Sequence, residues 1–295
     1  MLLLTGGAGF IGSHFLGAAP SSFKVRCLVR SASASRITPS PSVEIVPFDL
    51  LSEGPPDRWL EGVTCVVHLA ALLRKQDPSL MERVNVDATR RLVAAAQGAG
   101  VKKFVFASTE NVLREDLDDA YAATKRRAEE AVRGFANHLI LRPSFVYGPG
   151  DTHGLSRLIE AALKSPVIPL FGGLKGPIQP LHVDDMAEYL WRGVQTGVRG
   201  TYLVAGGEAL GLTDFLKRAC AARGARRLFV PIPYPVCRLS AMLGGLWGPK
   251  AAWGPAQFRN IYGGRAYSIE ETVRAFNYRP RPLAEGLSRW LASKP

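Results

Sequence analysis

The sequence predicts an α/β protein, a doubly wound parallel sheet joined to a smaller C-terminal lobe. Over the first two thirds of the chain, short β-branched runs alternate with segments that are long enough for helices. These runs are apolar almost throughout, which is typical of parallel strands that helices cover on both faces. After Pro143 the pattern changes, because glycine and proline become frequent and helical pieces alternate with loops.

The elements of the sheet can be assigned in order along the chain. We expect helices over Ile11–Ala19, Pro78–Gly98 and Ala120–Phe135, where apolar residues recur at helical spacing. The stretch Ser31–Ser42 is rich in serine and is expected to be a loop. The expected strands are Leu2–Leu4, Lys24–Val29, Val43–Pro47, Cys65–Leu69, Lys103–Ala107 and His138–Leu141.

Composition limits the class of protein and of partner. The chain has 295 residues, with 37 Lys and Arg against 25 Asp and Glu. This basic surplus is scattered and is not interleaved with aromatic residues, so we expect a phosphorylated small molecule rather than nucleic acid. No apolar run reaches the ~18 residues of a membrane span, and no integral membrane segment is expected. Four cysteines without a CxxC spacing and a short apolar start predict a cytoplasmic protein with reduced, buried thiols, and the histidines predict no metal site.

A glycine-rich turn follows the first expected strand. The run TGGAGFIG at 5–12 brings Gly6, Gly9 and Gly12 to the start of the first helix. Glycines here let the backbone turn tightly, let a pyrophosphate approach, and seat the helix against the strand. The free amides and the positive end of the helix then face the anion. This context predicts dinucleotide binding and a Rossmann fold.

The residues after the second expected strand indicate which dinucleotide is bound. An acid about 20 residues beyond the glycines would bind the ribose 2′-hydroxyl of NAD. Here Arg30 follows Val29, and no acid occurs before Glu44. A guanidinium can hold a 2′-phosphate, so we predict NADP as the cofactor, with NAD left open.

Two lobes are therefore expected. We assign 1–147 plus 177–205 to a dinucleotide-binding Rossmann domain and 148–176 plus 206–295 to a substrate-binding lobe.

A tyrosine and a lysine stand four residues apart in the third expected helix. Tyr121 and Lys125 therefore lie on one helix face. A free phenol has a pKa of about 10 and is a poor base at neutral pH. A nearby ammonium stabilises the phenolate, so this pair could exchange a proton with a substrate hydroxyl or carbonyl.

A series of short motifs then occurs in one order along nearly the whole chain. They are TGGAGFIG at 5–12, Asp49-Leu50, VHLAA at 67–71, NVDAT at 85–89, FAST at 106–109, YAATK at 121–125, LRPSFVYGPG at 141–150, LHVDD at 181–185 and FNYRP at 276–280. On these motifs the sequence resembles the extended short-chain dehydrogenase/reductase family, the NAD(P)-dependent epimerase/dehydratase group. The resemblance implies a Rossmann fold and redox chemistry with a nicotinamide cofactor.

The resemblance also implies roles for particular residues. The catalytic residues would be Tyr121, Lys125 and the hydroxyl of Thr109, with Ser108 as the alternative to Thr109. Glu110 is followed by Asn111 where the dehydratases of the family carry two acids, which disfavours 4,6-dehydration; Glu110 is equally expected to be a solvated loop acid. The implied cofactor-binding residues are Gly6, Gly9, Phe10, Ile11, Gly12, Arg30, Asp49, Leu50, Leu69, Ala70, Ala71, Asn85, Tyr121, Lys125 and Pro143.

The substrate is left open among three readings. The first is a nucleotide sugar, acted on by an epimerase or 4-ketoreductase, with Arg142, Arg259 or Arg265 as candidates for its phosphates. The second is an apolar alcohol or ketone, of the steroid or flavonol type, because Leu228 to Trp247, with Trp253 and Phe258, could form an apolar pocket or a surface that meets lipid. The third is a dinucleotide-binding subunit without turnover. A homodimer is a further expectation from the resemblance.

Overall fold

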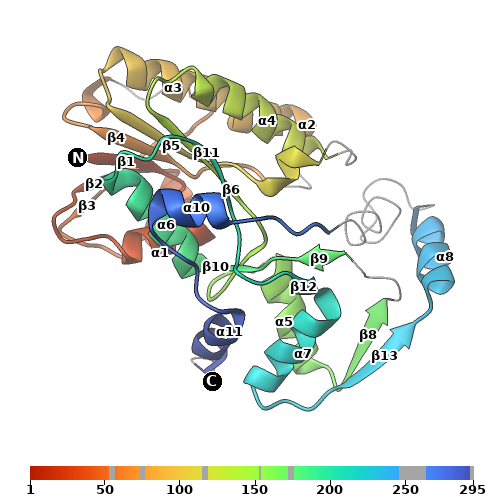
Figure 1. The fold of residues 1–295 in the computed structure, drawn as a ribbon. Coiled ribbons are helices and arrows are strands. Elements are labelled where there is room, and N and C mark those ends of the chain that lie inside the picture. The colour runs from red at the N-terminus through yellow and green to blue at the C-terminus, as the bar shows by residue number, and fades with distance from the viewer. Residues whose placement is uncertain are drawn as a thin grey trace.

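The computed structural model describes residues 1–52, 57–73, 77–114, 119–152, 154–171, 176–245 and 264–292. Its centre is a seven-stranded sheet in the order β11-β6-β5-β4-β1-β2-β3 (Figure 1), and all neighbouring strands are parallel. The predicted doubly wound fold is confirmed. The strands are β1 (Leu2–Thr5), β2 (Val25–Val29), β3 (Val43–Pro47), β4 (Cys65–His68), β5 (Lys103–Ala107), β6 (His138–Pro143) and β11 (Gly200–Val204).

The strand order reverses at β1, which pairs with β4 on one side and β2 on the other. This is the switch point at which doubly wound sheets bind ligands, outside the carboxyl ends of the strands. The glycine turn follows β1 directly, so the fold puts the turn at this point.

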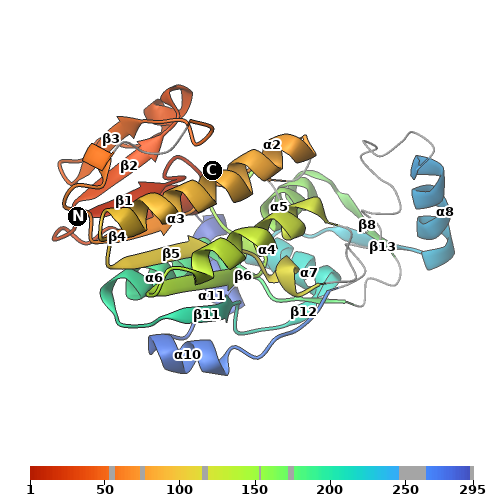
Figure 2. The same cartoon turned by 90° about the horizontal axis from the view of Figure 1, so that it is seen from above.

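Helices cover both faces of the sheet (Figure 1 and Figure 2). On one face lie α2 (Pro78–Glu82), the π-helical turn η3 (Arg83–Asp87), α3 (Ala88–Gly98) and α4 (Ala120–Arg133). On the other lie α1 (Phe10–Gly17), α6 (Val183–Gln195) and α10 (Glu270–Phe276). The single helix predicted over Pro78–Gly98 therefore contains a π-helical turn in its middle.

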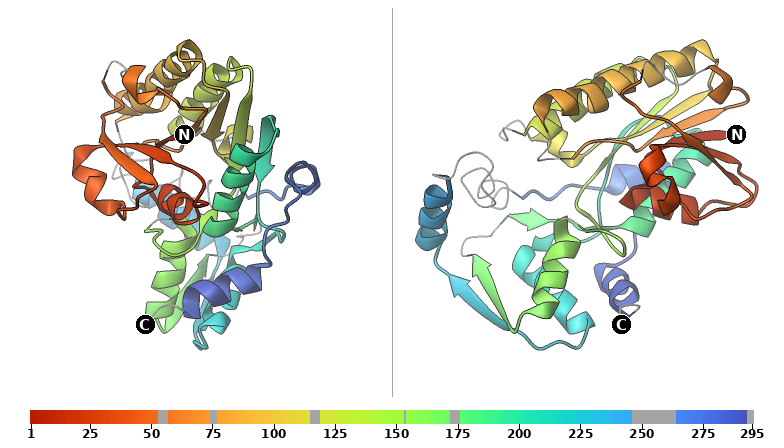
Figure 3. Two further views of the ribbon diagram at one scale, coloured as in Figure 1. Left: turned by 90° about the vertical axis from the view of Figure 1, so that its left-hand side faces the viewer. Right: turned by 180° about the vertical axis from the view of Figure 1, so that it is seen from behind.

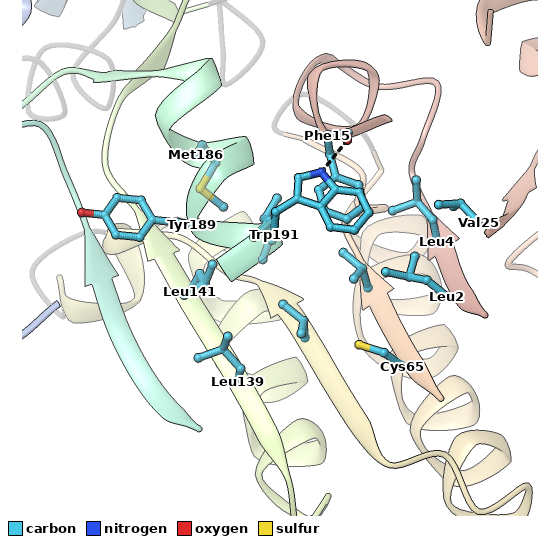
Figure 4. Close-up of a cluster of buried hydrophobic side chains, with 14 of the residues drawn as sticks. Leu2, Leu4, Phe15, Val25, Cys65, Leu139, Leu141, Met186, Tyr189 and Trp191 are labelled. Atoms are coloured by element: carbon cyan, nitrogen blue, oxygen red, sulfur yellow. Dashed lines mark hydrogen bonds between the residues drawn. The ribbon is translucent and has the colours of Figure 1, made fainter. Parts of the chain in front are cut away.

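The core below the sheet is built from aliphatic strand residues and aromatic helix residues (Figure 4). Phe15 of α1 and Trp191 of α6 stack with ring centroids 4.3 Å apart, and the Trp191 indole donates to the Phe15 carbonyl oxygen at 2.8 Å. Because both side chains are almost fully buried, each contributes about 1.5–3 kcal/mol through the hydrophobic effect. The contact fixes α1, and with it the glycine turn, against the rest of the molecule.

A second lobe lies beside the carboxyl edge of the sheet (Figure 1 and Figure 3). Its own core joins Leu155, Phe215 and Trp290 around the ring of Tyr147. Its strands and those that link it to the sheet are β7 (Val146–Tyr147), β8 (Val167–Phe171), β9 (Pro177–Ile178), β10 (Leu181–His182), β12 (Leu210–Gly211) and β13 (Leu228–Ile232). Its helices are α5 (Gly154–Lys164), α7 (Leu212–Ala222), α8 (Tyr234–Gly245) and α11 (Leu283–Ala292).

Three features differ from the sequence-based expectations. The stretch expected to be a loop contains a 3₁₀ helix, η1 (Ser31–Arg36), which Arg30 precedes as the N-cap residue. Strand β11 was not predicted; most of its residues are only half-buried, so it lacks the continuous apolar run of its neighbours. The helix α10 lies in the part assigned to the second lobe, yet Phe276 packs on Tyr189 and Tyr202, which belong to the sheet domain.

The four cysteines are free and buried, as predicted. In the described part of the chain, no helix has the length and apolar character that crossing a bilayer requires. The same residues contain no group of three or more His, Cys, Asp or Glu side chains that could hold a metal ion.

Candidate active site

The glycine turn after β1 depends on the absence of side chains at two positions. Gly6 has φ +78°, and a Cβ there would lie 2.6 Å from the backbone nitrogen of Ala70. A Cβ on Gly12 would lie 2.1 Å from the carbonyl oxygen of Gly6. Gly6 thus lets the turn pass the loop after β4, and Gly12 lets α1 pack against the turn.

The first turn of α1 is open to an anion. Its N-cap residue is Gly9, which supplies no side-chain cap, and no acidic residue lies in the first turn. The unpaired amides and the partial positive charge of a helix N-terminus therefore have no carboxylate of their own helix beside them. This is the arrangement that binds the pyrophosphate of a dinucleotide.

A cavity of about 300 Å³ opens beside this turn. Most of the cofactor-binding residues predicted on either side of the switch point line it: Gly6, Gly9, Arg30, Asp49, Leu50, Leu69, Ala70 and Ala71. The lining residues that the sequence analysis missed are Ala8, Leu28, Val29, Ser33, Arg36, Phe48, Leu51, Leu72, Leu80 and Val84.

Part of the cavity lining is basic. Arg30, Ser33 and Arg36 line it together because η1 turns these residues toward one side. Asp49 is the one acid among the lining residues, and its carboxylate accepts a hydrogen bond from the Leu51 amide at 2.9 Å. The sequence-based prediction lacks Ser33 and Arg36, because it expects a loop over Ser31–Ser42. Their spacing of three and six residues from Arg30 is a signal that could have found them.

The other predicted cofactor-binding residues lie outside the lining of this cavity. Phe10, Ile11 and Gly12 form the first turn of α1, and Pro143 ends β6. Asn85 is buried, and its side-chain amide forms hydrogen bonds within the protein. It accepts from the Leu72 amide at 2.7 Å and donates to the Leu72 carbonyl and to the Thr124 hydroxyl. Asn85 thereby ties the loop that lines the cavity to helix α4, which is a positioning contact.

Helix α4 presents Tyr121 and Lys125 one turn apart. The helix begins after Asp119, whose carboxylate accepts from the Tyr121 amide at 3.1 Å. Tyr121 is half-buried and Lys125 is fully buried, with its Nζ 4.1 Å from the centre of the Phe106 ring. Burial lowers the pKa of the Lys125 ammonium to about 7, against a smaller raising effect of the Glu129 carboxylate. Lys125 is therefore poised to exchange a proton near neutral pH.

His68 lies at the end of β4, where the charge of Lys125 acts on its imidazole. Burial, and then the Lys125 charge, lowers the pKa of His68 to about 3. Its Nδ1 lies 2.6 Å from the Thr5 hydroxyl and its Nε2 2.9 Å from the Thr89 hydroxyl. A neutral imidazole held at both nitrogens fits a structural role, and it adds no second positive charge beside Lys125.

The two hydroxyl candidates at the end of β5 differ in their surroundings. Ser108 is buried and donates to the Glu129 carboxylate at 2.6 Å. Thr109 is half-buried and caps the short helix η4 (Glu110–Leu113), where its hydroxyl accepts from the Asn111 amide at 3.3 Å. Ser108 is thus committed to the interior, which leaves Thr109 as the better candidate.

The Glu129 carboxylate also binds Arg142 of β6. Arg142 is one of the three arginines that the sequence offers as candidates for substrate phosphates. Arg142 donates to Glu129 at 2.9 and 2.6 Å. Burial opposes ionisation of Glu129, but the hydrogen bonds from Arg142 and Ser108 hold its pKa below the usual value. Arg142 is therefore an internal ion-pair partner. Arg265, another of the candidates, is described and exposed, and its role stays a prediction. Lying outside the described residues are Arg259, Trp253, Phe258 and Trp247.

Glu110 is not the solvated loop acid that was one expectation. Its side chain is buried, and burial raises its pKa to about 7, opposed by the nearby charge of Arg114. A carboxyl group that titrates near neutrality at the end of β5 can exchange protons.

Fold and site together define the class, which is an α/β protein with a glycine turn suited to an anion at the switch point and a tyrosine-lysine pair on helix α4. Comparison with known proteins identifies the family. A model of the NAD dependent epimerase/dehydratase family matches residues 2–206. The chain therefore belongs to the NAD dependent epimerase/dehydratase family, and it is an NAD-dependent enzyme of the oxidoreductase type.

Relatives with different substrates are similar to the chain. It is 31% identical over 251 residues to a ceramide reductase of Caulobacter vibrioides, with 84% of this chain and 78% of that protein covered. It is 28% identical over 268 residues to the 4-hydroxy-2-methyl-3-oxo-4-farnesyl-3,4-dihydroquinoline-1-oxide ketoreductase of Stigmatella aurantiaca, with 83% and 80% covered. The solved structure of MoeE5 in complex with UDP-glucuronic acid and NAD gives a TM-score of 0.74 at 25% identity, covering 99% of this chain and 97% of that one.

Proposed function

We propose that the protein is an NADP-dependent reductase of an apolar ketone, the second of the substrate classes that the sequence left open. The observation that carries this proposal is the apolar character of the second lobe. A cleft of about 210 Å³ there is lined by aliphatic residues of α5, β8 and α7, with Ser165 and Thr213 as the only polar side chains among its lining residues. Such a lining favours a hydrocarbon chain over a diphosphate.

Two further observations support the same class of substrate. Arg142, which was a candidate for substrate phosphates, is committed to Glu129. The two sequence relatives are by name reductases of a ceramide and of a farnesylated quinoline oxide.

The cofactor proposal is supported by two arginines in the lining of the 300 Å³ cavity. Arg30 and Arg36 would bind a 2′-phosphate, with the Ser33 hydroxyl between them. The turn at Gly6 and the uncapped start of α1 at Gly9 would hold the pyrophosphate. Bound NADPH would supply the hydride for reduction of the carbonyl carbon.

The residues of α4 would handle the proton. Tyr121 would donate its phenolic proton to the carbonyl oxygen as the hydride reaches the carbonyl carbon, which yields the alcohol. Lys125, one helical turn away with a pKa lowered to about 7, would stabilise the phenolate and pass a proton back to it. Thr109 would donate a hydrogen bond to the same oxygen and orient it.

A nucleotide sugar is the second candidate, and it was the first expectation from the sequence. The likeness to MoeE5, solved with UDP-glucuronic acid and NAD, supports it. An epimerase would remove and return the hydride at one sugar carbon, with Tyr121 moving the hydroxyl proton in both directions.

One experiment separates these functions. Purified protein is given NADPH with a panel of long-chain ketones, and NAD⁺ or NADP⁺ with UDP-glucose and UDP-glucuronic acid. Nicotinamide absorbance and product chromatography follow the reactions. We expect NADPH oxidation with at least one long-chain ketone and no new sugar product. Epimerised or oxidised nucleotide sugar without ketone turnover would contradict the proposal and support the second candidate.

A further inference from the structure

The outer end of the second lobe carries a concentrated apolar surface. Among the large apolar residues that the structure describes as exposed, eight of thirteen lie on β8, β13 and α8. We call this surface the apolar tip; its members are Val167, Leu228, Val230, Tyr234, Val236, Leu239, Met242 and Leu243. Isolated exposed apolar side chains are ordinary, whereas a contiguous patch marks an interaction site.

One half of the apolar tip is the outer face of a two-stranded sheet. Strands β8 and β13 pair in parallel, with Leu228 beside Val167 and Val230 beside Pro169. These four residues are exposed, whereas Ile168 between them is buried against the lobe. The face of a sheet that points to solvent normally carries polar residues. Here the four residues on that face are all apolar.

The other half is helix α8, which follows β13 and stands at the edge of the molecule, away from the central sheet (Figure 1 and Figure 2). Among the residues of α8 whose burial the structure describes, Cys237 is buried. Val236, Leu239, Met242 and Leu243 recur at helical spacing on the opposite face and are each more than half exposed. The helix thus turns a row of apolar side chains outward.

The chain segment that contains β13 and α8 carries charge of one sign. Between Asp214 and Glu270 the sequence has nine Lys and Arg residues and no acid. In the described part of this stretch, Arg238 lies on α8 beside the apolar face, and Arg226 is exposed two residues before Leu228. Like charges would oppose the pairing of two tips, so a second copy of the chain is a poor partner. Anionic lipid headgroups over hydrocarbon complement both the charge and the apolar face.

The apolar tip also continues into the aliphatic cleft. Val167 belongs to both, and Pro169, which lies beside Val230 in the strand pair, lines the cleft as well. We infer that the apolar tip docks on the surface of an anionic phospholipid bilayer, with α8 lying in the interface and Arg226 and Arg238 at the headgroups. This is peripheral attachment by side chains, and it goes beyond the proposed reaction. Because the apolar tip shares Val167 with the cleft of the proposed function, the test of the inference uses no substrate.

Vesicle co-sedimentation of the full-length protein tests the inference without any substrate, so its result is independent of the proposed function. Vesicles of phosphatidylcholine alone are compared with vesicles that also contain phosphatidylglycerol, at low and at high salt. We expect binding to the phosphatidylglycerol vesicles that weakens at high salt, because salt screens the charges. The double variant Leu239→Glu, Met242→Glu should lower the bound fraction about tenfold.

Two further variants make the test decisive. Leu73→Glu introduces the same change at an exposed leucine of the sheet domain and should bind like the parent protein. The second is the double variant Arg226→Glu, Arg238→Glu, which keeps the apolar residues and should lose the preference for phosphatidylglycerol. If the Leu239→Glu, Met242→Glu variant melts at a lower temperature than the parent protein, the binding of this second double variant tests the inference in its place. Parent protein that stays in the supernatant overturns the inference. So does equal binding of all variants, or a dimer in analytical ultracentrifugation that only the Leu239→Glu, Met242→Glu change disrupts.

Discussion

At the scale of single residues, the surroundings of each polar group separate the catalytic candidates from the positioning ones. Tyr121 is half-buried beside a buried cation, whereas Ser108, Asn85 and His68 have their polar atoms occupied by other parts of the protein. The sequence motifs assigned Tyr121 to catalysis, gave Ser108 as the alternative to Thr109, and predicted that Asn85 binds the cofactor, but they did not show which groups these side chains contact. The separation depends on long-range partners, such as Glu129 for Ser108, that no local spacing reveals.

Arg30 is predicted to decide between the two cofactors. Arg30→Ala should weaken NADPH binding about 10- to 100-fold, because a charge-assisted hydrogen bond to a 2′-phosphate is worth about 1.5–3 kcal/mol. NADH has no such phosphate, so its Kd should change less than about twofold. Isothermal titration calorimetry measures both. Arg90→Ala, a surface change on α3, serves as the control, and equal losses for NADPH and NADH would refute the role of Arg30.

At the scale of elements, the periodicity of the sequence identified six of the seven strands and the helices over the upper face of the sheet. It could not find β11, which is only half-buried and therefore lacks an apolar run. It also could not find η1, because the small residues of Ser31–Arg36 have no apolar periodicity. Because η1 was not predicted, Ser33 and Arg36 were absent from the predicted cofactor site, since their place in the cavity lining depends on η1.

The packing of α1 against the glycine turn gives a test at this scale. Gly12→Ala would force a Cβ to 2.1 Å from the Gly6 carbonyl oxygen. We expect a loss of about 3 kcal/mol or more in the free energy of unfolding, because rigid backbone must shift. Gly17→Ala is the matched control in the same helix, since a Cβ there meets nothing within 4 Å. That control should be neutral or stabilising by about 1 kcal/mol at most. Urea unfolding measures both, and similar stabilities for the two variants would refute the packing role of Gly12.

At the scale of the whole molecule, a side chain of the sheet domain bonds to the backbone at the start of the second lobe. His14 of α1 places Nδ1 2.8 Å from the Asp184 carboxylate and Nε2 2.9 Å from the Pro149 carbonyl oxygen, beyond the end of β7. Both partners are acceptors, so the doubly protonated imidazolium satisfies them best. The predicted homodimer, by contrast, stays a prediction.

The two hydrogen bonds of His14 should make the free energy of unfolding depend on pH. Burial disfavours the charged His14, but the Asp184 and Pro149 hydrogen bonds outweigh it and raise the pKa of His14. The stabilisation is therefore fully present below the unfolded pKa of about 6.5 and is lost as pH rises through the higher folded value. We expect the free energy of unfolding to fall by about 1 kcal/mol as pH rises through this range. The variant His14→Gln should lack this dependence on pH. Urea unfolding at several pH values measures it, with His138→Gln as control. An unchanged pH profile in His14→Gln would contradict this role of the two hydrogen bonds.

The central claim is that the Tyr121 hydroxyl carries the proton of the reaction while Lys125 sets its acidity. The most direct test measures kcat and the NADPH Kd of Tyr121→Phe, with Tyr202→Phe as the control. The variant should lose about 10²- to 10⁴-fold in kcat, as expected when general acid catalysis is removed. Its NADPH Kd should stay within about twofold, because the cofactor cavity is lined by other residues. A kcat of Tyr121→Phe close to that of the parent enzyme would contradict the account.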